Sequence, residues 1–302
     1  MPSKRGRRRA VDALLVELCT GDAVEARVDA RDADDLAAAA RFHRIAPLAH
    51  VRLREARPDL AAGLRGDRDR ARMHHLRVCA TVAGLAGVLD GLEWLVFKGP
   101  VLSQVAHPVP GLRSYNDLDL LVAPDRLRET CSRLYEAGWR AVFDTDLLRG
   151  PELPGELALI GAAGLWLDLH WSVVLAQSSR RRSPVSTDEL VERRVPVGLG
   201  GVTVATFDPA DSLLHVCHHA ALTGAKRLLH LLDADRLARR VEDWDEVVRR
   251  ARAWHIQAEL ALVLGRARRL LVTPVPPDLN RRLGLSAGFG ALVTLIVFRM
   301  DL

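Results

Sequence analysis

The chain has 302 residues, of which 49% are hydrophobic and 27% are charged, and its formal net charge is +5. This composition is typical of a globular protein with a sizeable core, and it excludes a disordered chain, a collagen-like repeat and a disulfide scaffold. The four cysteines are scattered, without a Cys-x-x-Cys pair. Their spacing disfavours a zinc knuckle or a redox dithiol and is typical of a reducing cytoplasm.

The N-terminal part of the chain shows helical patterns behind a basic start. Residues 1–10 carry five basic side chains and no acidic one, so we expect a flexible basic arm. Residues 11–92 are predicted to be a helical region, with an N-cap at Asp32, a helix start at Pro58 and a long helix over Arg68–Leu92. Basic runs can contact nucleic acid, but the aromatic residues are too few, and not interleaved with them, to predict a stacking platform.

From residue 93 the pattern changes to short apolar runs separated by turn signals. Residues 93–206 are predicted to form a mixed sheet with flanking helices, one of which begins at Pro124 and ends at Gly138. The predicted strands are Trp94–Phe97, Leu118–Val122, Trp139–Phe143, Leu157–Ile160 and Gly164–Trp171, followed by a polar loop at Ser178–Ser183 and a hairpin over Val195–Val204. This order of elements indicates an α+β fold.

Residues 207–302 are predicted to be a C-terminal helical domain. Its first helices are expected at Pro209–Leu222, Ala225–Arg240 and Asp243–Trp254. The run Leu283–Phe298 is uncharged but falls short of the about 20 residues that a spanning helix needs, so we expect a buried helix, with a weak tail anchor as the alternative. No transmembrane segment and no secretory signal are predicted, and a cytoplasmic protein is expected.

Three carboxylates lie within these strand patterns. Asp117 and Asp119 are two residues apart and therefore project from one face of a predicted strand. Carboxylates this close must share a proton or hold a cation. Asp168 stands inside an apolar strand, where a charge is costly unless it is paired or bound to metal. The alternatives are solvated carboxylates at a strand end for the pair and a structural ion pair for Asp168.

A turn suited to phosphate precedes the carboxylates. The strand that ends at Lys98 is followed by Gly99-Pro100 and by a predicted short helix. Glycine lets backbone N–H groups approach a phosphate, and a helix start favours anions. Since carboxylates suit Mg²⁺, the whole segment predicts a cradle for a metal-bound nucleoside triphosphate.

The motifs also follow one another in a distinctive order. They are Lys98-Gly99, Gly111-Leu112-Arg113, Asp117-Leu118-Asp119-Leu120-Leu121-Val122, Leu134 with Gly138-Trp139, and Asp168-Leu169-His170-Trp171, followed by Leu214–Ala220 and Leu228–Asp233 in the helical part. This order resembles the uncharacterised-nucleotidyltransferase family of the polymerase-β-like superfamily, over residues 75–255. The resemblance implies a minimal nucleotidyltransferase core within residues 93–206, extended by helices on both sides.

The resemblance also implies a catalytic site. Asp117 and Asp119 would be two metal ligands and Asp168 the third, with Mg²⁺ or Mn²⁺ as cofactor, NTP as substrate and Gly99 as the glycine of the triphosphate turn. In this sequence Pro100 stands where the superfamily usually has serine.

Three side chains could replace the missing serine in binding the nucleotide. Ser103 lies one helical turn further along, and Lys98 or Arg113 could supply positive charge to the phosphates.

Further polar residues are candidates for a substrate pocket. His170 shares a strand face with Asp168 and could orient a ligand, with a hydrogen-bonded core histidine as the alternative. Lys226, His230 and Asp233 share one helical face that would bound the nucleotide or acceptor pocket, with a helix–helix salt bridge as the alternative.

Three histidines also lie close together on one predicted helix. They are His215, His218 and His219. The pattern lacks the glutamate of a His-Glu-x-x-His zinc site, so we expect one buried structural histidine and one, His219, that lines the cleft.

These features predict an enzyme that moves NMP from NTP to an acceptor hydroxyl and releases pyrophosphate, by a two-metal mechanism. A small-molecule acceptor is preferred, and a protein side chain or an RNA end is the alternative. A non-catalytic nucleotide- or partner-binding protein on the same fold is the competing class. Three costly carboxylates argue against it, since a pure binder has no need of them.

Overall fold

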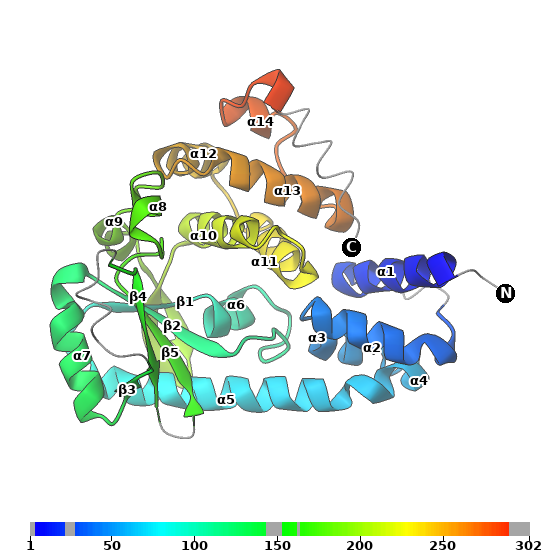
Figure 1. Cartoon of the computed structure of the whole chain (residues 1–302), viewed down its shortest axis with the longest axis horizontal. Helices are drawn as coiled ribbons and strands as arrows, with labels where there is room; N and C mark the ends of the chain where they lie inside the picture. The colour runs from blue at the N-terminus through cyan, green and yellow to red at the C-terminus, as the bar shows by residue number, and fades with distance from the viewer. Residues whose placement is uncertain (1–3, 22–27, 143–152, 162–163, 290–302) are drawn as a thin grey trace.

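The computed structural model describes residues 4–21, 28–142, 153–161 and 164–289 (Figure 1). The α-helices are α1 (Lys4–Thr20), α2 (Ala33–Phe42), α3 (Ala46–Leu53), α4 (Pro58–Ala61), α5 (Arg65–Val88), α6 (Gly99–Val105), α7 (Leu127–Glu136), α8 (Gln177–Arg180), α9 (Thr187–Glu192), α10 (Pro209–Leu222), α11 (Leu228–Ala238), α12 (Trp244–Ala253), α13 (Gln257–Leu271) and α14 (Leu279–Arg282). Short 3₁₀ turns precede α2, α5 and α7 at Ala30–Asp32, Ala62–Leu64 and Pro124–Arg126.

Within the described residues the strands form one mixed sheet, in the order β3-β4-β5-β2-β1-β7-β6. They are β1 (Trp94–Phe97), β2 (Asp117–Val122), β3 (Arg140–Ala141), β4 (Glu156–Ile160), β5 (Trp166–His170), β6 (Val195–Leu199) and β7 (Val202–Thr206). β2 runs antiparallel to β1 and parallel to β5. The predicted α+β fold is confirmed, and its central strands are the ones that carry the acidic motifs.

The two faces of the sheet pack against different helices. Leu118 and Leu120 of β2 join Val78 of α5 in one core, and Figure 1 shows α5 running along that side. Phe97 and Leu121 point the other way, into a larger core shared with α1, α3, α10, α11 and α13. The alternation along β2 follows from the two-residue period of a strand, and both faces are apolar because both are covered.

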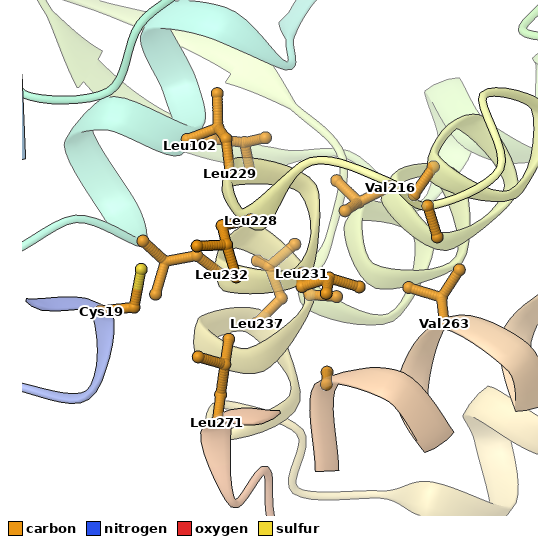
Figure 2. Packing of buried hydrophobic residues seen from close by; sticks show 14 of the residues in the cluster. Cys19, Leu102, Val216, Leu228, Leu229, Leu231, Leu232, Leu237, Val263 and Leu271 are labelled. Atoms are coloured by element: carbon orange, nitrogen blue, oxygen red, sulfur yellow. The ribbon is translucent and has the colours of Figure 1, made fainter. Parts of the chain in front are cut away.

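Helix α11 forms the centre of the larger core. Figure 2 shows its leucines among side chains from four other helices, and the labelled residues are Cys19 of α1, Leu102 of α6, Val216 of α10, Leu228, Leu229, Leu231, Leu232 and Leu237 of α11, and Val263 and Leu271 of α13. Because α11 is packed on all sides, its one acidic residue that faces the sheet, Asp233, is held in place with 1% of its surface exposed.

Most predicted elements are confirmed, and the differences lie at their ends. A helix begins at Lys4, where a flexible arm was expected. Helix α11 begins at Leu228 rather than Ala225, because Ala225 has a positive φ of 49° that ends the preceding turn. Helix α8 occupies part of the loop expected at Ser178–Ser183.

Two predictions fall partly outside the described residues. The residues outside the described ranges include Phe143, the last residue of one predicted strand, and residues 290–298 of the predicted C-terminal helix. None of the helices that the structure describes combines the length and the apolar character needed to cross a bilayer.

Candidate active site

Strands β2 and β5 bring acidic side chains to one face of the sheet. In the parallel register Asp117 lies opposite Trp166, Asp119 opposite Asp168, and Leu121 opposite His170. Residues that are paired or two apart share a face, so both aspartates of β2 project on the same side as Asp168 and His170. Ligand atoms of Asp119, Asp168 and His170 all lie within 4.8 Å of one another. The predicted convergence of three carboxylates at neighbouring strands is therefore what the backbone register produces.

Asp119 is the buried centre of this cluster. Its Oδ1 accepts a hydrogen bond from Lys98 Nζ at 2.7 Å and lies 3.1 Å from His170 Nε2. Burial alone would raise the pKa of Asp119, but Lys98 and His170 more than offset it and hold the pKa below its ordinary value. Asp119 is therefore ionised, and Lys98 balances part of its charge.

The other two carboxylates carry the unbalanced charge of the cluster. Burial, followed by repulsion from Asp119, raises the pKa of Asp117 and raises that of Asp168 to about 6. Among the described residues neither of these two side chains has a basic ion-pair partner. Crowded carboxylates with raised pKa values mark a place where a cation would be favourable.

Glu156 is a member of the cluster that the sequence analysis missed. It lies opposite His170 in the β4–β5 register, and its Oε2 is 3.2 Å from His170 Nδ1. The imidazole is thus held between Glu156 and Asp119, which fixes its orientation. The signal in the sequence was only an acidic residue at the start of a strand, and it becomes informative once the strand pairing is known.

The conformation of the turn after β1 is set by packing against Tyr115. Lys98 has a φ of 53°, a left-handed conformation that is uncommon for a residue with a side chain. A Cβ atom on Gly99 would lie 2.7 Å from Cδ2 of Tyr115. Glycine is therefore needed at position 99 to let the Tyr115 ring approach. That ring is held by a 2.7 Å hydrogen bond between its hydroxyl and His75 Nδ1.

A cavity of about 330 Å³ opens beside the carboxylates, between the sheet and α10 and α11. Its lining includes most of the predicted site residues, namely Lys98, Gly99, Arg113, Asp117, Asp119, His219 and Asp233. It also includes His230, which the helical spacing placed on a face that bounds the pocket, and Arg44, Arg227 and His215, for which no place in the pocket was predicted. Asp168 and His170 are not among the residues that line it, but both lie beside Asp119 on the same face of the sheet.

The histidines of the cavity are neutral. Burial within the pocket, reinforced by the nearby Lys98 ammonium, lowers the pKa of His219 to about 3. Burial lowers the pKa of His230 to about 4. The rings of His215 and His219 are 6.4 Å apart and nearly parallel, and His230 meets His219 edge-on at 5.5 Å. They form an uncharged wall facing a basic one, and the prediction that His219 lines the cleft agrees with this geometry.

Arg113 is engaged differently from the sequence expectation. Its Nε and Nη2 donate to both carboxylate oxygens of Asp233 at 2.8–3.1 Å, and His107 Nε2 lies 2.9 Å from Asp233 Oδ1. The guanidinium group of Arg113 therefore forms a buried ion pair that connects the turn before β2 to α11. The alternative considered for Asp233 was a helix–helix salt bridge, but its partner Arg113 lies in a turn, and Asp233 also lines the cavity.

Two other expectations are wrong. Ser103 is fully buried, and its Oγ accepts the backbone N–H of Gly111 at 2.8 Å, so it braces a loop and does not face the cavity. Lys226 is exposed and precedes α11, so it does not share a helical face with His230 and Asp233 and does not line the cavity. Arg227, the next residue, lines the cavity instead.

One comparison with known proteins identifies the family to which this chain belongs. The chain belongs to a family of nucleotidyltransferases described as uncharacterised, whose model matches residues 29–272. A similar solved structure is that of an antigenic nucleotidyltransferase-like protein from Paracoccidioides brasiliensis. It has 14% identity and a TM-score of 0.44, and the match covers 68% of this chain and 95% of that chain. No curated protein matches the chain significantly. The family predicted from the motifs is thus confirmed.

Proposed function

We propose that this protein is a divalent-metal-dependent nucleotidyltransferase that moves NMP from an NTP to an acceptor hydroxyl, with a small molecule as the preferred acceptor. The observation that carries the proposal is the cluster of Asp117, Asp119 and Asp168 on one sheet face, beside a cavity with basic walls. Clustered carboxylates next to basic side chains suit a triphosphate that arrives with a metal ion. Membership of the nucleotidyltransferase family supports the reaction class.

The donor set suits a hard divalent cation. Asp119 and Asp168 offer oxygen ligands within 4.8 Å of each other, and Asp117 lies on the same face. These three side chains would hold Mg²⁺ or Mn²⁺, which when bound neutralises phosphate charge and lowers the pKa of the acceptor hydroxyl. His170, clamped by Glu156, positions the Asp119 carboxylate.

The residues of the chain divide the remaining work. Lys98 and Arg227 line the cavity and bind phosphate oxygens. The acceptor oxygen forms a bond to the α-phosphorus while the bond from that phosphorus to the bridging oxygen breaks. Pyrophosphate leaves with the electron pair, and the hydroxyl proton passes to the Asp168 carboxylate. Arg113 acts as a positioning residue, because its guanidinium is committed to Asp233.

One observation favours the competing, non-catalytic reading. The 2.7 Å ion pair between Lys98 and Asp119 balances the central carboxylate without any cation. A nucleotide-binding protein that performs no transfer could keep such a pair permanently. The unbalanced Asp117 and Asp168 weigh against this reading, since a bound cation would relieve the repulsion that both carboxylates add without protonating either of them.

The two readings are separated by measuring metal binding and transfer on the same samples. Mn²⁺ binding is followed by electron paramagnetic resonance, and transfer by pyrophosphate release from each of the four NTPs with a panel of small alcohols, proteins and RNA. Asp119→Asn removes the central carboxylate, and Asp125→Asn is the matched control because Asp125 is exposed at the start of the 3₁₀ turn before α7.

We expect the wild type and Asp125→Asn to bind Mn²⁺ and release pyrophosphate, and Asp119→Asn to lose both by about 100-fold or more. Transfer that survives in Asp119→Asn would contradict the proposal. Mn²⁺–NTP binding without turnover on any acceptor would favour the binding protein. Label recovered on a protein or an RNA end would keep the reaction and change the acceptor.

A further inference from the structure

A second cavity, of about 550 Å³, adjoins the candidate active site on its outer side. It lies among α2, α3, α5 and the turn that precedes β2, and Figure 1 shows α2 and α3 beside the N-terminal part of α5. Its volume is within the usual range for a small-molecule site. The proposed chemistry at the carboxylates does not use this cavity.

The walls of this second cavity are strongly basic. Arg41, Arg44, Arg70 and Arg77 line it, and Asp67 is its only acidic lining residue among those described. Asp67 is shared between two of these arginines, with N···O distances of 3.0 Å to Arg41 and 2.8 Å to Arg70. Asp67 therefore serves both Arg41 and Arg70, and Arg44 adds a positive charge that no acidic residue among the described lining residues balances.

The excess positive charge of the second cavity is located at Arg44. Its side chain is half-buried, and no hydrogen bond or ion pair of its guanidinium is found within the described part of the chain. Burial, together with the nearby Arg227 and Arg113, lowers its pKa, and Asp117 offsets only part of this effect. A partly desolvated guanidinium that faces other guanidiniums is costly unless an anion binds beside it.

The second cavity is continuous with the first. Arg44, Ser114 and Tyr115 line both of them. The charge of Asp117 also acts on Arg44 and on His74, which lines only the second cavity. A molecule anchored there would therefore adjoin the cavity that holds Asp117 and Asp119, with Arg44, Ser114 and Tyr115 between the two.

We propose that the second cavity binds the acceptor, and that the acceptor is a small hydroxyl compound carrying a phosphate or carboxylate group held by Arg44 and Arg70. The planar fork of arginine matches both anions with paired hydrogen bonds. The anion sets the position of the compound, and its hydroxyl lies toward Asp117. The assignment of the bound compound as the acceptor rests on the proposed transferase function, whereas the presence of an anion site does not depend on it.

The test begins with binding, so that it does not depend on turnover. Inorganic phosphate and malonate are titrated by calorimetry at low ionic strength into wild type whose first cavity is saturated with an α,β-methylene NTP analogue. Arg70→Glu reverses one charge of the second cavity at an exposed helical position, 73% exposed at the side chain. Arg65→Glu is the matched control, because Arg65 is equally exposed on α5 and does not line the cavity.

We expect phosphate, malonate or both to bind wild type and Arg65→Glu alike, and Arg70→Glu to bind about tenfold more weakly, since charge reversal replaces attraction by repulsion. Affinity for the NTP analogue, measured alongside, should be the same in all three proteins. The inference is overturned if neither anion binds wild type, or if both variants lose binding equally. If no NTP analogue binds at all, the titration is run without it, and the proposed function fails separately from the anion site.

The second arm identifies the source of the anion. Glucose, glucose 6-phosphate and glucuronate share a ring and differ at one carbon, and each is tested as the acceptor. A lower KM for one of the two charged sugars than for glucose supports the inference and identifies the anion. Arg70→Glu should abolish this difference in KM and leave the KM for NTP unchanged. Equal KM values for all three would contradict it, as would an oligoribonucleotide that displaces phosphate at a much lower concentration than either charged sugar.

Discussion

We expect Asp233→Leu to lower the free energy of unfolding by about 3–5 kcal/mol. The Asp233 side chain is 2% exposed and holds three groups at once: Arg113 Nε, Arg113 Nη2 and His107 Nε2, at 2.8–3.1 Å. Removing it leaves Arg113, whose side chain is 10% exposed, without a counter-charge, and leaves His107 without its hydrogen-bond partner. Most of the loss is the cost of that stranded guanidinium rather than the worth of the contacts.

The double variant separates these two contributions. Arg113→Met with Asp233→Leu replaces the ion pair by apolar side chains of similar size, and we expect its stability to lie within about 1–2 kcal/mol of wild type. Arg113→Met alone should also cost about 3–5 kcal/mol, because it strands the buried Asp233 carboxylate, so the coupling energy in the double-mutant cycle should be about 4 kcal/mol or more. Asp59→Leu is the control, because Asp59 pairs with Arg57 at 2.7 Å but is 40% exposed, and it should lower the stability far less than Asp233→Leu does.

Urea unfolding followed by far-ultraviolet circular dichroism measures the wild type, the three variants of the cycle and the Asp59→Leu control on one scale. A loss below about 1 kcal/mol for Asp233→Leu would refute the reasoning, because a buried pair cannot be broken so cheaply. Additive losses in the cycle would refute it as well, since they would show that the two side chains do not depend on each other.

Two further changes test the local geometry. Gly99→Ala places a methyl group 2.7 Å from the Tyr115 ring and should lower the free energy of unfolding in urea by about 1–3 kcal/mol. Gly84→Ala is the control, because its methyl group would meet nothing within 4 Å inside helix α5, and it should raise the stability by up to about 1 kcal/mol. Equal effects of the two substitutions would contradict the packing argument. Burial, with Arg266 and Arg227 nearby, lowers the pKa of His43 to about 4, below its unfolded value, so its contribution to stability is complete above pH 6.5 and is lost as the pH falls toward 4. His43→Gln should therefore flatten the decline of the urea midpoint between pH 6.5 and pH 5 by the equivalent of about 1–2 kcal/mol, and an unchanged decline would count against a buried neutral imidazole.

The strands of the site were predictable because their apolar pattern is strong and local. Leu118, Leu120 and Val122 alternate with the acidic residues of β2, and the same alternation around Asp168 gives β5. The two-residue period was sufficient to place Asp117 and Asp119 on one face and to put His170 with Asp168. The family motif then indicated that these two strands are neighbours, which no local pattern shows.

The remaining parts of the site depend on contacts between distant segments. Arg44 reaches the cavity from the turn before α3, and Glu156 reaches His170 only through the β4–β5 register. Ser103 and Lys226 were misplaced for the converse reason: spacing along a helix does not say which side of it is buried, or where the helix begins. The commitment of Arg113 to Asp233 joins residues 120 positions apart in the chain, which spacing cannot reveal.

The packing around α11 has a consequence for how the molecule can be divided. The predicted boundary between residues 206 and 207 cuts through a single continuous core, in which Phe97 and Leu121 of the sheet pack with leucines of α10, α11 and α13. A fragment that ends at residue 206 would keep the acidic strands but expose their inner face to water. The acidic strands β2 and β5 therefore cannot be transferred to another protein by themselves, because the C-terminal helices that cover them would have to be transferred as well.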